Sequence, residues 1–281
     1  MLRTSDDLLQ AFELHIRKPS FVVGNEGRYT RNILKQTGLP AEEFDRLLDE
    51  HRNLLPRMNL GAWTGPREEV SAEPLTGRET DDFADELLAR GHLIAAAMRR
   101  ASALEGKQRW GFKILGDVIH AKQYASAFPR AQVILLVRDP RDHALSVMKL
   151  NDQRKDRGQP LFYESYRDVA LGWLQTIRDG RLALEASGLD YVTMRYEDLV
   201  REPKTEMRRL EEMLGIDLVN ADTFYKAEYI EAHTRRFKHH DNLKNPINAD
   251  SVGKWRSKMS SEEAGVFLEI AGSEMEYWGY A

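Results

Sequence analysis

The chain has 281 residues, of which 42% are hydrophobic and 31% are charged, and its formal net charge is -4. This length is enough for one large α/β domain. The acidic balance argues against a general nucleic-acid binder, and the lack of cysteine excludes disulfides, thiolate metal sites and cysteine nucleophiles. The opening residues lack the pattern of a signal peptide, and no apolar run reaches about 18 residues, so we expect a cytoplasmic protein without a membrane span.

The first motif is a glycine-containing loop at residues 24–32, between a short apolar run and residues at helical spacing. This order predicts a strand, a loop and the start of a helix. Backbone N–H groups and a helix N-terminus in such a loop can bind phosphate, and Arg28, Thr30 and Arg31 can add side-chain donors. The alternative is an ordinary turn with solvated arginines. The loop is not a Walker A motif.

A second helix is predicted to open at Pro40, with Glu42 and Glu43 in its first turn. Acidic residues there usually complement the helix dipole, but these two also lie shortly after the phosphate-like loop. The following residues, 45–106, are mostly helical in pattern and rich in charge.

The next predicted strand, Trp110 to Gly116, contains Lys113 within its apolar face. A lysine in a short strand is costly unless its ammonium group is paired or reaches a cleft. Asp117 and His120 follow and are candidates for acid–base groups, with a structural role as the alternative.

The central stretch is predicted to be a buried strand, Val133 to Val137, followed by a tight turn and a helix. Asp139 can cap that helix, and Pro140 is compatible with its first position because no N–H is needed there. Asp142 is placed where a carboxylate complements the positive end of the helix.

Arg138 is the unusual residue of this stretch, because it follows the carboxyl end of a buried strand, where open α/β sheets bind ligands. An anion is its expected partner, and the hydroxyl of Ser146, on the following helix, can supply a second donor. The alternative is that Arg138 pairs with Asp139 or Asp142 and that Ser146 only packs.

The elements after this helix continue an alternating pattern. Residues 151–160 are predicted to be a mobile loop, and a long helix follows that should end near Gly188. Another strand is expected at residues 190–195, and a further helical stretch up to Gly215. Alternation of strands and helices predicts a parallel, doubly wound sheet with helices on both faces.

The last part of the chain is basic between residues 225 and 248 and contains the adjacent pair His239 and His240, which has no companion at metal-ligand spacing. Further on, residues 251–256 precede an amphipathic helix that Ser260 is expected to open. The glycine, basic residues and indole of this segment could clamp a phosphate and a purine, or anchor the helix.

Three motifs in this order, VRDPRDHALS, RYEDL and SVGKW, resemble those of sulfotransferases that use 3′-phosphoadenosine-5′-phosphosulfate (PAPS). The resemblance covers about residues 19–281. It implies a single α/β domain over residues 1–281 with a P-loop-like fold and a mostly parallel central sheet. It further implies that residues 45–109 form a helical insertion on the acceptor side and that residues 233–281 close over the nucleotide.

The resemblance also implies roles for individual residues. Arg138 and Ser146 would hold the 3′-phosphate of PAPS, and Tyr196 would lie near the adenine. The segment that closes the site would contribute Lys254, Trp255 and Arg256. The first loop departs from the usual pattern of the family, with Arg28 and Thr30 preferred as contacts among the candidates Gly27, Arg28, Tyr29, Thr30, Arg31 and Asn32.

The histidine base of cytosolic members is absent after Lys113, so the resemblance implies a glutamate base, Glu43 in preference to Glu42. Arg28 and Lys113 would offset charge on the transferred group, without a metal. The implied acceptor is a hydroxyl or amine of a small molecule or carbohydrate, and the product is adenosine 3′,5′-bisphosphate. The alternative is a catalytically weakened protein that binds the nucleotide or serves as a partner subunit. No nucleic acid is expected, and a homodimer is possible.

Overall fold

The computed structural model of the protein describes residues 39–51, 92–93, 95–104, 106, 109–111, 117–156, 158, 160–216, 218 and 247–281. The predicted first strand and loop, Lys113 and the histidine pair lie outside these residues.

Two strands pair in parallel at the centre of the described structure, β1 (Gln132–Val137) and β2 (Asp190–Arg195). Their register runs from Gln132 opposite Asp190 to Val137 opposite Arg195. Neighbouring residues of a strand point to opposite faces, and each face of β1 joins its own hydrophobic cluster. The predicted parallel sheet, with both strands at the expected positions, is therefore confirmed.

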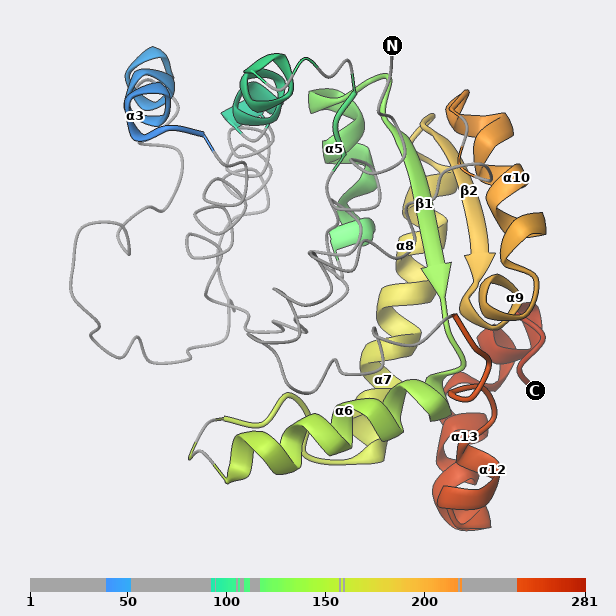
Figure 1. Ribbon diagram of the computed structural model, residues 1–281. Coiled ribbons are helices and arrows are strands. Elements are labelled where there is room, and N and C mark those ends of the chain that lie inside the picture. The colour runs from blue at the N-terminus through green and yellow to red at the C-terminus, as the bar shows by residue number, and fades with distance from the viewer. Residues whose placement is uncertain are drawn as a thin grey trace.

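Helices cover both faces of this sheet (Figure 1). On one face, Leu135 and Val137 join a core built from α6 (Pro140–Lys155), α7 (Tyr166–Leu174), α8 (Gly180–Glu185) and α13 (Ser261–Tyr277). On the other, Ile134 and Leu136 pack against a cluster that includes Leu210 of α10 (Pro203–Leu214). The remaining described elements are α3 (Ala41–Glu50), a helix within residues 92–104, η2 (Asp117–His120), α5 (Ala121–Ala127), α9 (Tyr196–Arg201), α10 (Pro203–Leu214) and α12 (Trp255–Lys258).

Helix α6 (Pro140–Lys155) begins as the sequence predicts, because the Asp139 side chain accepts a hydrogen bond from the Arg141 N–H at 2.9 Å and Pro140 opens the helix. Its end differs from the prediction of a mobile loop from residue 151. The helix continues to Lys155, and buried Asn151 accepts a hydrogen bond from the Phe162 N–H at 2.8 Å. This contact fixes the following segment to the helix.

The predicted long helix is present but is divided into α7 (Tyr166–Leu174), a π-helical turn η3 (Gln175–Asp179) and α8 (Gly180–Glu185). The backbone at Gly180 packs tightly, since a Cβ there would clash with a methyl carbon of Val118. The helix ends before Gly188, whose φ of +74° favours glycine.

The last helix, α13 (Ser261–Tyr277), opens with the expected cap. The hydroxyl of Ser260 accepts the Glu263 N–H, and the Glu263 carboxylate accepts the Ser260 N–H. The helix packs against α7 through the fully buried Phe267, and the chain then returns to the sheet at Tyr280. None of the helices in the described residues is both long and apolar enough to cross a membrane.

Candidate functional site

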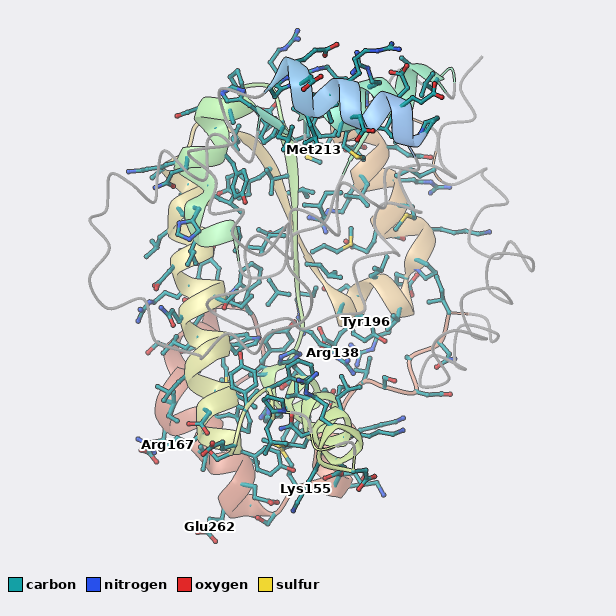
Figure 2. The ribbon with its side chains drawn as sticks, turned by 90° about the vertical axis from the view of Figure 1, so that its left-hand side faces the viewer. Arg138, Lys155, Arg167, Tyr196, Met213 and Glu262 are labelled. Carbon is teal, nitrogen blue, oxygen red and sulfur yellow. The ribbon has the colours of Figure 1, made fainter. Side chains whose placement is uncertain are left out.

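Arg138 and Tyr196 lie side by side at the carboxyl edge of the sheet (Figure 2). Because Val137 is opposite Arg195 in the parallel register, the next residue of each strand leaves the sheet at the same place. The guanidinium carbon of Arg138 lies 4.5 Å from the centre of the Tyr196 ring. Two residues that the sequence singled out for the nucleotide are therefore brought together by the strand pairing.

The guanidinium of Arg138 is only partly used by the protein. Its Nη2 donates to the carbonyl of Ser251 at 2.9 Å, whereas its buried Nε has no hydrogen-bond partner among the residues that the structure describes. A buried donor without a partner costs free energy, so this arrangement favours binding of an acceptor from outside the described residues. Within the described residues, Arg138 forms no ion pair with Asp139 or Asp142, contrary to the alternative interpretation of the sequence.

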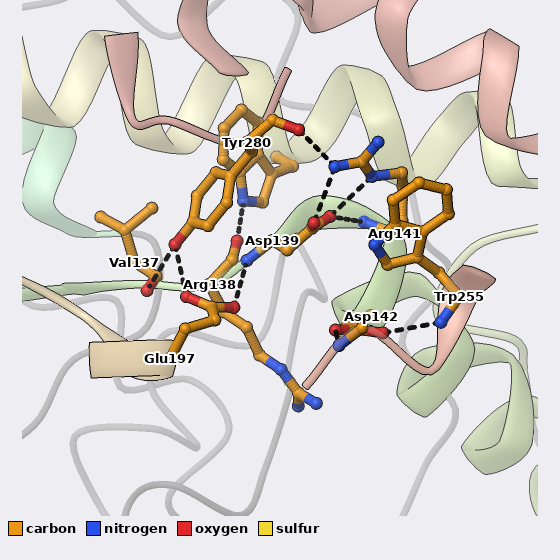
Figure 3. Close-up of polar contacts among 10 residues, drawn as sticks. Val137, Arg138, Asp139, Arg141, Asp142, Glu197, Trp255 and Tyr280 are labelled. Carbon is orange, nitrogen blue, oxygen red and sulfur yellow. Dashed lines mark hydrogen bonds and ion pairs between the residues drawn. The ribbon is translucent and has the colours of Figure 1, made fainter. Parts of the chain in front are cut away.

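A network of buried groups holds the backbone of the turn that presents Arg138 (Figure 3). Asp139 accepts two hydrogen bonds from the guanidinium of Arg141, at 2.9 and 2.8 Å, and Arg141 also donates to the Tyr280 carbonyl. The Glu197 carboxylate accepts the Asp139 N–H at 3.0 Å and the Tyr280 hydroxyl at 2.7 Å. Burial, with the negative charge of Glu197, raises the pKa of the Tyr280 hydroxyl. The side chain of Arg138 extends away from this network.

Asp142 ties the segment before α12 to the first turn of α6. Its carboxylate, which is only 1% exposed, accepts the N–H groups of Gly253 and Trp255 at 2.5 and 2.9 Å. The ring of Trp255 lies 3.7 Å from the guanidinium carbon of Arg141 and 4.5 Å from that of Arg256. The predicted nucleotide-closing segment is thus bound directly to the turn that carries Arg138.

The other predicted residues of this region lie at the surface. Ser146 is exposed, and its hydroxyl donates weakly to the Asp142 carbonyl at 3.4 Å. Lys254 and Arg256 are also exposed, on the segment that Asp142 binds. Their predicted contacts with a nucleotide stay predictions.

His143 is a partly buried titratable residue in the first turns of α6. Its backbone N–H donates to the Asp139 carbonyl at 2.9 Å. Desolvation, with a smaller contribution from the positive charge of Arg138, lowers the pKa of His143 to about 4. The imidazole is therefore neutral at pH 7, and the positive charge at this edge of the sheet comes from guanidinium and ammonium groups.

Glu42 and Glu43 occupy a different part of the molecule. Glu43 forms ion pairs with Arg46 at 2.9 Å and with Arg100 at 3.1 Å. Helix α3, which carries both glutamates, lies near the level where β1 begins, whereas Arg138 follows its other end (Figures 1 and 2). The structure does not bring Glu42 or Glu43 beside Arg138, and the role of a base stays a prediction.

The remaining predicted site residues lie outside the described residues. They are Lys113 and the loop residues Gly27, Arg28, Tyr29, Thr30, Arg31 and Asn32. Asp117 and His120 are described and form the ends of η2. Across the part of the chain that the structure describes, no three histidine, aspartate or glutamate residues gather as metal ligands do.

Sequence reasoning missed the residues that build the network around the turn. Glu197 lies within RYEDL, next to Tyr196. The signal that the sequence offers is a glutamate directly after a predicted strand, and the structure shows that this glutamate is buried. For Asp142 the sequence predicts only an interaction with the helix dipole, and that interaction needs no tertiary partner. Tyr280 carries no signal in the sequence, because its hydrogen-bond partners are far from it along the chain. They include Arg141, at the start of α6, and Glu197, on α9.

Comparison with known proteins tests the resemblance. A model described as the sulfotransferase family matches residues 25–220, which is more than half of the chain. This chain belongs to the sulfotransferase family. Carbohydrate sulfotransferase 4 of Mus musculus is 24% identical over 164 residues, which cover 53% of this chain and 41% of the mouse protein. The chain therefore matches only about two fifths of the length of that relative. The predicted family is confirmed, and the sulfotransferase model ends before the segment that Asp142 binds.

Glu197→Gln should lower the free energy of unfolding by about 1–3 kcal/mol, because one end of the amide presents a donor where the carboxylate accepts from Asp139 or Tyr280. Asp198→Asn is the matched control, since its side chain is 44% exposed and 3.8 Å from Arg195. Its effect should stay within about 0.5 kcal/mol. Urea unfolding measures both variants. Equal effects of the two substitutions would contradict the buried network.

His143→Gln should make stability less dependent on pH between about 6.5 and 4. The folded imidazole resists protonation, so in the wild type the unfolded state binds the extra proton and stability falls as the pH drops through this window. The variant should lose about 2 kcal/mol less than the wild type between pH 7 and pH 4.5. Urea unfolding across this range provides the measurement. Parallel pH profiles for the two proteins would rule out the buried neutral imidazole.

Proposed function

We propose that this member of the sulfotransferase family transfers the sulfuryl group of PAPS to a hydroxyl or amine of a carbohydrate or other small molecule. The observation that carries the proposal is the guanidinium of Arg138, which lies at the carboxyl edge of the sheet and whose buried Nε has no partner in the described part of the chain. A phosphate provides the acceptor oxygens that this donor lacks. In a chain of this family, the 3′-phosphate of PAPS is the corresponding anion.

PAPS, when bound, supplies an activated sulfuryl group, and adenosine 3′,5′-bisphosphate is its leaving group. In our proposal Arg138 and Ser146 hold the 3′-phosphate, and Tyr196 lies against the adenine. Lys254 adds positive charge on the same side, from the segment that touches Arg138 through Ser251. Trp255 and Arg256, whose side chains contact each other, complete this side of the nucleotide.

At the reacting end of the donor, we propose that Arg28 and Thr30 hold the 5′-phosphate and that Arg28 and Lys113 offset the charge on the transferred group. Glu43 would accept the proton of the attacking acceptor group. The match to a mouse protein whose name includes carbohydrate sulfotransferase supports a sugar as the acceptor. The proposal includes no metal, because the transferred sulfuryl group carries less charge than a phosphoryl group.

Arg138→Met should weaken the binding of adenosine 3′,5′-bisphosphate about 10- to 100-fold, because it removes charge-assisted hydrogen bonds to the 3′-phosphate. Binding of adenosine 5′-monophosphate, which has no 3′-phosphate, should change little. Isothermal titration with both nucleotides separates these effects.

Arg130→Met is the matched control, since this exposed arginine precedes the amino-terminal end of β1 and the change in net charge is the same. It should leave both affinities unchanged. A wild type that binds the two nucleotides equally well, or an Arg138 variant that binds the bisphosphate undiminished, would remove the 3′-phosphate site from the proposal.

Glu43→Gln should slow transfer of labelled sulfate from PAPS to a panel of sugars about 100-fold or more, while the affinity for the bisphosphate stays unchanged. Glu50→Gln is the control, because Glu50 also lies on α3 and pairs with Arg100 at 3.0 Å. Full turnover by the Glu43 variant would exclude it as the base. A wild type that binds the bisphosphate but transfers sulfate to none of the sugars would favour the nucleotide-binding alternative.

A further inference from the structure

We propose that Asp142 is a positioning residue that fixes the segment 251–256 against the first turn of α6 and so sets where Lys254 lies relative to Arg138. This inference rests on the proposed function for the identity of the ligand. It adds a residue that touches no substrate and acts only through the position of its neighbours.

The contacts of Asp142 are those of a clamp on the backbone around Lys254. The two N–H groups that its carboxylate accepts belong to Gly253 and Trp255, the residues on either side of Lys254. Gly253 has a φ of +71°, a conformation that lets successive N–H groups turn toward one carboxylate and that favours glycine. Both oxygens of Asp142 are used, one for each N–H, so the direction of the segment is determined on both sides of the lysine.

The burial of Asp142 makes this clamp strong. The residue is 1% exposed, and the structure shows no ion pair between it and the other described residues. A buried carboxylate without a cation needs hydrogen bonds to its charged form, and here the N–H groups of Gly253 and Trp255 provide them, while the positive end of the α6 dipole adds favourable electrostatics. Release of the segment would remove both of these hydrogen bonds at once. The segment is therefore expected to stay bound before any nucleotide arrives.

Two further contacts connect the clamp to the anion site. Arg138 donates to the Ser251 carbonyl, at the beginning of the same segment, at 2.9 Å. The Trp255 ring stacks on Arg141, whose guanidinium is itself held by Asp139. The segment thus approaches Arg138 at one end and is fixed to α6 at the other, with Lys254 between these two points. A substitution of Asp142 should therefore change the position of Lys254 before that of other residues.

Asp142→Asn tests the inference, since an amide keeps the shape of the side chain but presents a donor to one of the two N–H groups. The variant should weaken binding of adenosine 3′,5′-bisphosphate about tenfold, and Lys254→Met should do the same. The double variant should be only about tenfold weaker than the wild type, instead of about a hundredfold, because a displaced lysine has no further contact to lose. Additive effects would overturn the inference, since Asp142 would then not act through Lys254.

Asp152→Asn is the matched control, because Asp152 is an exposed residue of the same helix. It should bind the bisphosphate as the wild type does. Gly253→Ala strains the backbone φ of +71° that turns this segment toward Asp142, without changing Asp142 or a residue assigned to the nucleotide, and should also give non-additive losses with Lys254→Met. This second variant keeps the test decisive where Asp142→Asn folds poorly.

Hydrogen exchange without nucleotide separates this inference from the proposed function. Amides of residues 251–258 should exchange faster in folded Asp142→Asn than in the wild type or in Asp152→Asn. Unchanged exchange in the Asp142 variant would overturn the clamp, whatever the ligand. A wild type that shows the clamp by exchange but binds no bisphosphate would instead overturn the proposed function.

Discussion

Three buried carboxylates around one turn hold the described structure together. Asp139, Asp142 and Glu197 lie within or beside the turn between β1 and α6, and each accepts hydrogen bonds from a different part of the chain. Through them the turn is joined to Arg141, to the helix after β2 and to the segment before α12. Because buried charge is costly without such partners, the network binds the last part of the chain to the sheet. The aromatic core beneath α13 then adds apolar burial to the same attachment.

This network also explains why Arg138 remains available. The two carboxylates that follow Arg138 in the sequence are held elsewhere, Asp139 by Arg141 and Asp142 by backbone N–H groups, and neither forms an ion pair with the arginine among the described residues. Tyr196 supports one face of the guanidinium, and Ser251 takes one of its donors. A fixed positive group whose buried Nε has no partner in the described part of the chain suits the proposed anion, because the arginine would need little rearrangement to bind it.

Membership of the sulfotransferase family is the basis for proposing which anion the Arg138 guanidinium binds. The family model covers the sheet, the turn and Arg138, whereas the segment bound by Asp142 lies beyond it. The proposed anion site is thus built from two parts of the chain, the turn that carries Arg138 and the segment 251–256, and the buried carboxylate of Asp142 joins them. In the proposed function, the transferred group, the acceptor and the base are assigned to a second half of the site, for which the sequence supplies candidates in the loop at 24–32 and in α3.

The sequence by itself determined the elements whose signals are local. The apolar run of β1, the Asp139 cap with Pro140, the Ser260 capping box and the three sulfotransferase motifs were all readable, because hydrophobic period and capping depend on neighbours along the chain. Only the tertiary structure decided that Asp142 binds Gly253 and Trp255 and that Glu197 binds Tyr280. It also decided that α6 continues to Lys155 and that the Asn151 side chain accepts the Phe162 N–H. The sequence does not indicate which distant N–H or hydroxyl group will donate to a given carboxylate or amide oxygen, because only folding brings the two groups within hydrogen-bond distance.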